Sequence, residues 1–199
     1  MYRGSSPRIL PLIIVILIVA LVIAALVTIG RMVFSGGSQS TSDQDKDTVS
    51  KSVLDTSSTR SVRWTVRGPI VANENFRSYQ ITISPTLRDY TIYSGYLSQP
   101  IQVKTYTNNQ AAYEQFVFAL NNADIGTVRT ADNTDIRGVC ATGGLAYTFE
   151  TLGNDTPDHT LWSSTCKGSQ GSLGANALQI QALFVNQIPD FKPQFTSVY

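Results

Sequence analysis

The stretch VRWTVR, from Val62 to Arg67, decides the fold of this chain. Apolar and polar side chains alternate along it, with Val62, Trp64 and Val66 in one set and Arg63, Thr65 and Arg67 in the other. Successive side chains of a β-strand point to opposite faces, so a period of two is typical of a half-buried strand. The stretch therefore predicts a sheet with one apolar face in a core and one polar face in solvent.

Three runs that follow repeat this alternation and predict three more strands. They are YQITI with Tyr79, Ile81 and Ile83, RDYTIY with Tyr90 and Ile92, and PIQVKTY with Ile101 and Val103. Turn-forming residues such as Pro85 separate the runs. The intervals are too short for the crossover connections that parallel neighbours need, so the strands are expected to be mostly antiparallel.

The period then changes to that of a helix. After Asn108 or Asn109, each a good N-cap, QAAYEQFVFALNN predicts an amphipathic helix that ends near Asn122. LAYTFETL and TLWSSTC predict two further strands, and ANALQIQALFVNQIPDF predicts a second helix that stops at Pro189. The order predicts an α+β fold, in which a mostly antiparallel sheet of about six strands has two helices packed on one face.

A long apolar run precedes this domain. From Ile9 to Gly30 no side chain is charged, and roughly 20 apolar residues suffice for a helix to cross a bilayer. A secretory signal peptide is the competing interpretation, but its apolar part is normally shorter and ends at a small-residue cleavage site. We expect an uncleaved signal-anchor, with residues 1–34 forming a cytoplasmic tip and a single transmembrane helix in the lipid bilayer.

The charges flanking this run predict its orientation. Arg3 and Arg8 precede it without any acidic residue, which places the N-terminus in the cytoplasm and the rest of the chain outside the cell membrane. With Arg31 also set aside, 12 basic and 14 acidic residues remain from Ser35 onward, a net charge of −2. This balance offers no general attraction to nucleic acid.

The composition divides the part outside the membrane into two. Residues 35–60 are rich in Ser, Thr and Asp and nearly without large apolar groups, so we expect a flexible or partly helical linker. A short helix near Val49 to Leu54 is compatible with this segment. Residues 61–199 are long enough to bury a single core and form the predicted extracytoplasmic domain.

Both cysteines stand at the ends of the predicted second hairpin. In an oxidising compartment, Cys140 and Cys166 are expected to form a structural disulfide. A bridge that closes a loop of this size stabilises a domain by roughly 3–4 kcal/mol. The spacing is not the C-x-x-C of a redox-active pair.

The same loop contains His159, the only histidine. Its acidic neighbours Asp155 and Asp158 suggest a metal cluster, and Ser163 or Ser164 suggests a serine hydrolase. However, a zinc site needs three or four ligands, and G-x-S-x-G is absent. Gly153, Asn154 and Pro157 favour a solvated turn instead. We therefore expect no metal, no cofactor and no catalytic residue here.

Four arginines of the predicted strands form a candidate ligand-binding patch. Arg63 and Arg67 share the polar face of the first strand, and the patch extends further if the alignment of the neighbouring strands adds Arg77 and Arg88. Such a patch is suited to an anionic envelope polymer or an acidic protein partner. The alternative is a solvated sheet face without a ligand.

The pattern CATGG…YTFE…LWSSTC…ALFVNQIPDF resembles that of small single-pass envelope proteins of the Saccharibacteria type. The resemblance covers the C-terminal region only. It implies a cell-envelope setting and supplies no catalytic residues.

These observations predict a membrane-anchored extracytoplasmic interaction module that binds a protein or an envelope polymer and is not an enzyme. One alternative is a membrane-tethered hydrolase that uses His159 with nearby acids. Another is an accessory subunit of a membrane complex. The sequence determines neither the partner nor the oligomeric state.

Overall fold

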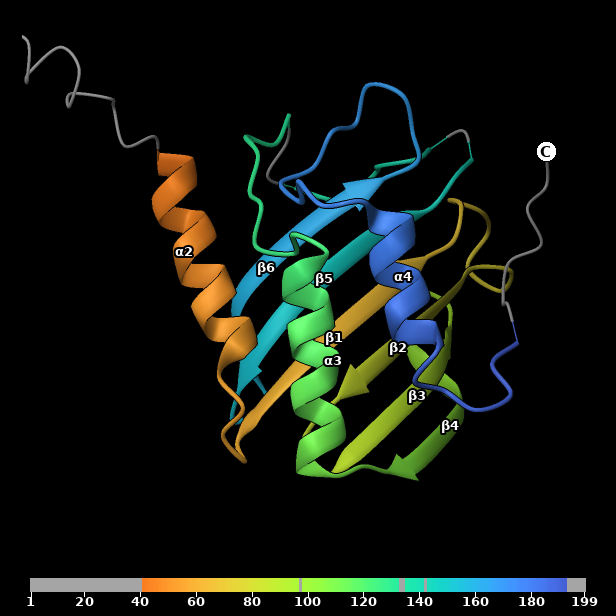
Figure 1. Ribbon diagram of the computed structural model, residues 1–199. Coiled ribbons are helices and arrows are strands. Elements are labelled where there is room, and N and C mark those ends of the chain that lie inside the picture. Colours follow the sequence, from red (N-terminus) through yellow and green to blue (C-terminus); the bar gives the residue numbers. More distant parts are fainter. Residues whose placement is uncertain (1–40, 97, 133–134, 142, 193–199) are drawn as a thin grey trace, which may run out of the picture. The chain divides into compact units, whose positions relative to one another are not determined.

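A computed structural model describes residues 41–96, 98–132, 135–141 and 143–192, which all belong to one compact unit beginning at Thr41. The unit is an α+β fold with a six-stranded antiparallel sheet in the order β4-β3-β2-β1-β5-β6 (Figure 1). The elements are α2 (Thr41–Leu54), β1 (Arg60–Arg67), β2 (Arg77–Ile83), β3 (Leu87–Ser94), β4 (Gln99–Thr107), α3 (Gln110–Asn122), β5 (Ala146–Gly153), β6 (Thr156–Ser164) and α4 (Ala177–Val185).

Strand β1 lies at the centre of the sheet, between β2 and β5. Its three apolar side chains are buried completely or almost so, and its register places Trp64 opposite Ile81 on one side and Phe149 on the other. Directly opposed residues of antiparallel strands lie on the same face. The apolar positions of the central strands therefore form one continuous buried face, as the alternation predicts.

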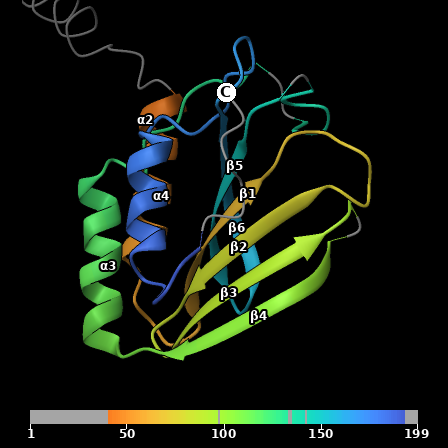
Figure 2. The same cartoon turned by 90° about the vertical axis from the view of Figure 1, so that its right-hand side faces the viewer.

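The two predicted helices cover this buried face. Asn109 caps α3 by accepting a hydrogen bond from the Ala112 N–H, and Asn176 caps α4 in the same way. Figure 2 shows both helices on one side of the sheet. The Phe184 ring of α4 stacks on Trp64 at 5.9 Å between centroids, which joins the helix layer to the central strand.

The opposite side of the sheet, called the open face below, carries the other set of side chains. The register assigns to it, in three central strands, Arg63, Thr65, Arg67, Ser78, Gln80, Thr82, Asp89, Thr91 and Tyr93. None of the described helices lies over it (Figure 2). These residues are polar or aromatic, and the register adds the exposed aliphatic side chains of Leu87 and Val103 where β3 pairs with β4.

A third helix, α2, occupies most of the segment for which a linker is predicted. Val49 and Val53 are 3% and 0% exposed and belong to the core, where α2 packs against α3. The compact unit therefore starts well before Ser61. Two valines one helical turn apart thus give α2 its buried contact with the domain although the rest of the segment is polar.

The two edges of the sheet differ. At β6, the Leu173 N–H donates to the Trp162 carbonyl at 2.8 Å and the Trp162 N–H donates to Ser172 Oγ at 3.2 Å, so the segment around residue 172 covers this edge at Trp162. At β4, Ile101 and Val103 are 56% and 62% exposed. An edge strand with apolar exposed side chains is open to pairing with another strand.

The predicted transmembrane helix at residues 9–30 and the first part of the predicted linker lie outside the described residues. Within the described ranges, no helix has the length and apolar character needed to cross a membrane.

We predict that Val53→Ala lowers the free energy of unfolding by about 2 kcal/mol, because it leaves a cavity where α2 meets the core. Lys51→Ala, an exposed position on the same helix, should change it by less than about 0.5 kcal/mol. Urea unfolding of the two variants measures both effects. Equal stability of the two would mean that α2 is not part of the cooperative unit.

Candidate binding site

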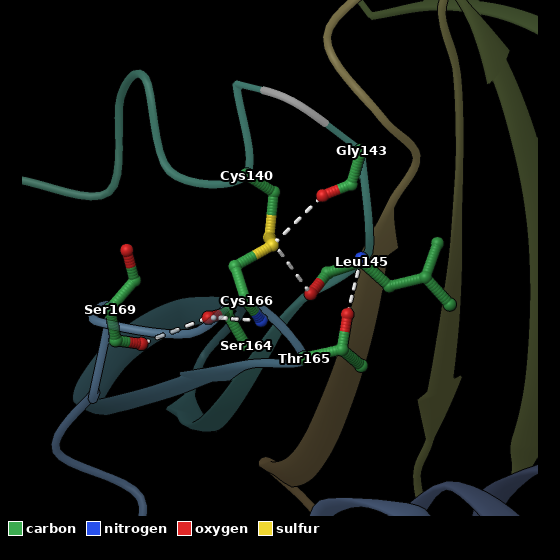
Figure 3. Close-up of a disulfide and its surroundings, with 7 residues drawn as sticks. All are labelled: Cys140, Gly143, Leu145, Ser164, Thr165, Cys166 and Ser169. Carbon is green, nitrogen blue, oxygen red and sulfur yellow. Dashed lines mark hydrogen bonds between the residues drawn. A yellow bond between two sulfur atoms is a disulfide. The ribbon is translucent and has the colours of Figure 1, made fainter.

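The disulfide joins the loop that precedes β5 to the segment that directly follows β6. Cys140 and Cys166 are bonded, with their Cα atoms 5.4 Å apart (Figure 3), which confirms the predicted pairing. The Leu145 N–H donates to Thr165 Oγ1 at 2.9 Å, and the Cys166 N–H donates to Ser164 Oγ at 3.2 Å. The disulfide is therefore a structural cross-link at one end of the β5–β6 hairpin.

We predict that Cys140→Ser combined with Cys166→Ser lowers the free energy of unfolding by roughly 3–4 kcal/mol, since the unfolded chain is no longer restricted by the loop. Urea unfolding measures this loss. Wild-type protein reduced with a phosphine should lose the same amount. A smaller loss in the reduced protein than in the double variant would show that serine, not the missing bond, causes the effect.

The far end of the same hairpin is a tight turn. Asn154 and Asp155 both have positive φ, 50° and 62°, between the end of β5 and the start of β6. Two successive residues in this conformation are typical of a hairpin turn whose twist matches that of the strands. Asp155 thus serves the turn rather than a cluster with the histidine.

His159 lies opposite Thr151 in the register of the two strands. Its neighbour Asp158 contacts α2 and β1 instead, with Arg60 Nη1 2.7 Å and Ser52 Oγ 3.1 Å from Asp158 Oδ2. The Ser164 hydroxyl, a candidate nucleophile from the sequence, donates to the Ser169 carbonyl at 2.9 Å. Across the described residues, no three His, Cys, Asp or Glu side chains come together in a way that could hold a metal ion.

The Asp158 carboxylate is the centre of a network that fastens α2 to the sheet. Partial burial, the largest influence, raises its pKa, but hydrogen bonds from Thr151, Arg60 and Ser52 together outweigh burial. The result is a pKa lowered from 3.8 to about 2. The network is therefore strongest when Asp158 is ionised.

We predict that Asp158→Asn lowers the free energy of unfolding by about 1 kcal/mol at pH 7, a modest effect because the carboxylate is partly exposed and screened. The pKa is lower in the folded state, so the contribution is complete above about pH 4 and is lost as the pH falls towards 2. Urea unfolding at pH 7, 4 and 2 should show the difference from wild type shrinking in the last interval.

Asp155→Asn is the matched control, because asparagine accepts the positive φ of the turn. It should leave the free energy of unfolding at pH 7 close to that of wild type, because the turn keeps its backbone conformation. A difference between wild type and Asp158→Asn that is as large at pH 2 as at pH 7 would contradict the assignment.

The register divides the four candidate arginines between the two faces. Arg63 and Arg67 lie on the open face. Arg77 and Arg88 lie on the helix-covered face, because each is two residues from a buried tyrosine of its own strand, Tyr79 in β2 and Tyr90 in β3. Arg77 donates to the Glu74 and Phe76 carbonyls and to Ser94, and Arg88 donates to the Thr107 and Gln187 carbonyls. The register therefore separates Arg77 and Arg88 from Arg63 and Arg67, and both of them bind loop carbonyls to the sheet.

The remaining two arginines differ in their partners. Arg63 Nη1 lies 3.4 Å from the Glu150 carboxylate of β5. The Arg67 guanidinium lies over the Phe76 ring, 5.5 Å from its centroid, and no described carboxylate is within ion-pair distance of it. Arg67 is therefore the cation of the open face that remains able to bind an anion.

Arg67 lines a cavity of about 330 Å³ on the open face. The other lining residues come from three adjacent strands and the turns beside them: Thr65, Phe76, Ser78, Gln80, Tyr93, Tyr96 and Ser98. The register explains the grouping, because Arg67 is opposite Ser78, Thr65 is opposite Gln80, and Ser78 is opposite Tyr93. His159 is not among the lining residues.

The aromatic rim of the cavity is held in place by hydrogen bonds. The Tyr96 ring stacks on Phe76 at 4.1 Å between centroids. Its hydroxyl donates to the Val71 carbonyl at 2.7 Å, and its backbone N–H donates to the Asn73 side chain at 3.0 Å. Gly95 has a φ of 71°, a conformation that glycine adopts readily, and a Cβ there would press on Asn73.

No protein-family model matches the chain, and neither a curated protein nor a solved structure shows significant similarity to it. The likeness to Saccharibacteria-type envelope proteins therefore stays a prediction. Sequence reasoning found Arg67 but missed its aromatic neighbours. The alternation along its strand assigns Tyr93 to the face opposite to that of Tyr90 and Ile92. Phe76 and Tyr96 lie in turns, where no such alternation applies.

Proposed function

We propose that this chain is a single-pass membrane protein that displays its α+β domain on the extracytoplasmic side of the cell membrane and binds an anionic envelope ligand through the open face. The cavity around Arg67, a cation with no described carboxylate partner, carries the proposal. The uncharged run from Ile9 to Gly30 and the arginines before it support the anchor and its orientation.

The chemistry of the cavity favours binding over catalysis. Its lining offers hydroxyl groups, one amide, aromatic rings and one guanidinium. Proton transfer in enzymes most often uses an imidazole, and it also uses carboxylates, amines, thiols and tyrosine hydroxyls. Of these groups the described lining provides only the hydroxyls of Tyr93 and Tyr96, which favours a non-enzymatic interaction module.

The charges of the open face leave one cation for an anionic ligand. Arg63 is already paired with Glu150, and Asp89 is placed two strands away from Arg67. An anion that reaches the cavity therefore meets one cation beside a row of neutral polar groups. A charge-assisted hydrogen bond of this type is worth roughly 1.5–3 kcal/mol.

We predict that Arg67→Gln weakens the retention of a labelled anionic polymer on intact cells carrying the full chain by about tenfold or more. Arg63→Gln is the matched control, because it removes the same charge from the same strand and face but not from the cavity. It should change retention by less than about threefold. The comparison also includes lysed cells and an acidic protein as a competing ligand.

Equal losses from both substitutions, or from neither, would reject the cavity as the binding site. Binding by lysed cells but not by intact cells would reject the outward orientation. Displacement of the polymer by the acidic protein at equal concentration would identify a protein surface, and not a polymer, as the better ligand.

A further inference from the structure

We infer that the ligand is an acidic glycan, in which a sugar ring packs on the aromatic rim and its carboxylate or phosphate binds Arg67. This inference rests on the function proposed above and adds the chemical class of the ligand. Three features of the cavity carry it: a fixed aromatic surface, a set of neutral groups that both donate and accept hydrogen bonds, and the surrounding backbone.

The aromatic surface is available and already ordered. Tyr96 is 40% exposed, while the Phe76 ring beneath it is buried. Because Val71 and Asn73 hold Tyr96 at both ends, little conformational entropy is lost when a ligand packs on its ring. The C–H groups on one side of a sugar ring form a flat apolar surface that matches such an aromatic face.

The polar groups of the cavity match sugar hydroxyls. Thr65, Ser78, Tyr93 and Ser98 contribute hydroxyls, and Gln80 contributes an amide. Each of these groups both donates and accepts, as does each hydroxyl of a sugar. A polyanion without hydroxyls can only accept hydrogen bonds, so it would use the donors of these groups and leave their acceptor oxygens to water.

The backbone around the cavity argues against an extended peptide. A peptide that adds to a sheet needs an unpaired strand edge. The cavity lies over β1, β2 and β3, and each of these strands is paired on both sides. The open edge at β4 does not contribute to the cavity lining.

The size and charge of the site favour a short, singly charged part of a ligand. A volume of about 330 Å³ is near the lower end of ligand pockets, roughly 300–1,000 Å³, so it accommodates a short part of a polymer. A nucleic acid would require several cations along its phosphates. Arg67 is the single cation in the described lining.

The test uses the full-length protein in detergent and four immobilised polymers. Polygalacturonate offers sugar and carboxylate, phosphomannan offers sugar and phosphate, dextran offers sugar alone, and polyglutamate offers carboxylate alone. We expect at least tenfold tighter binding of one or both acidic glycans than of dextran or polyglutamate. The better of the two identifies the anionic group.

Tyr96→Ala should weaken binding of the acidic glycan by about tenfold and leave the weak binding of polyglutamate unchanged. Phe118→Ala is the matched control, because Phe118 is 52% exposed on α3, on the helix-covered side of the sheet. It should have no effect on either polymer. Thr65→Val removes one hydroxyl from the central strand at nearly constant side-chain shape, and it should weaken glycan binding severalfold. This variant keeps the test decisive if Tyr96→Ala does not fold.

Two results separate this inference from the function on which it rests. Polyglutamate bound as tightly as polygalacturonate, with dependence on Arg67 but not on Thr65 or Tyr96, would overturn the glycan and leave an anion-binding module. Dextran bound as tightly as the acidic glycans would overturn the role of the anion. Absence of any Arg67-dependent binding would overturn both proposals.

Discussion

The packing of Trp64 against the helix layer is the constraint on which this structure depends. Its ring is fully buried and stacks on Tyr147 at 5.5 Å and on Phe184 at 5.9 Å, so it joins two strands and a helix. Since Trp64 must point inward, its neighbours Arg63 and Thr65 must point outward, because alternate residues of a strand face opposite sides. The core and the cavity are thus two consequences of the same alternation.

The open face differs from an ordinary solvated sheet surface in how its groups are arranged. The partly buried side chains of Arg63 and Glu150 neutralise each other, whereas Arg67 lies over an aromatic ring. Tyr96 and Phe76 are stacked in turns that hydrogen bonds hold in position. Such order in a turn costs conformational entropy, and it places a rigid aromatic surface beside a cation. This combination is the reason why the face is interpreted as a site.

Much of the fold could be predicted from the sequence, because strands and helices leave periodic patterns. The alternation at Val62, Trp64 and Val66 and the cysteine pair both led to correct predictions. Helix α2 was not predicted at its full length, since only Val49 and Val53 mark it within a polar segment. Of the residues that line the candidate site, only Arg67 was predicted. The positions of Arg77, Phe76 and Tyr96 depend on strand register and turn geometry. The periodic pattern of a single sequence predicts neither of these.

The unequal edges of the sheet limit how copies of this domain can assemble through strands. The backbone of β6 at Trp162 already bonds to residues 172 and 173, whereas β4 exposes Ile101 and Val103. If two copies join through β4, the edges left at both ends are β6 edges whose backbone is covered at Trp162. A head-to-tail series would have to pair β4 with this partly covered edge, so a symmetric pair through β4 is favoured over a fibre.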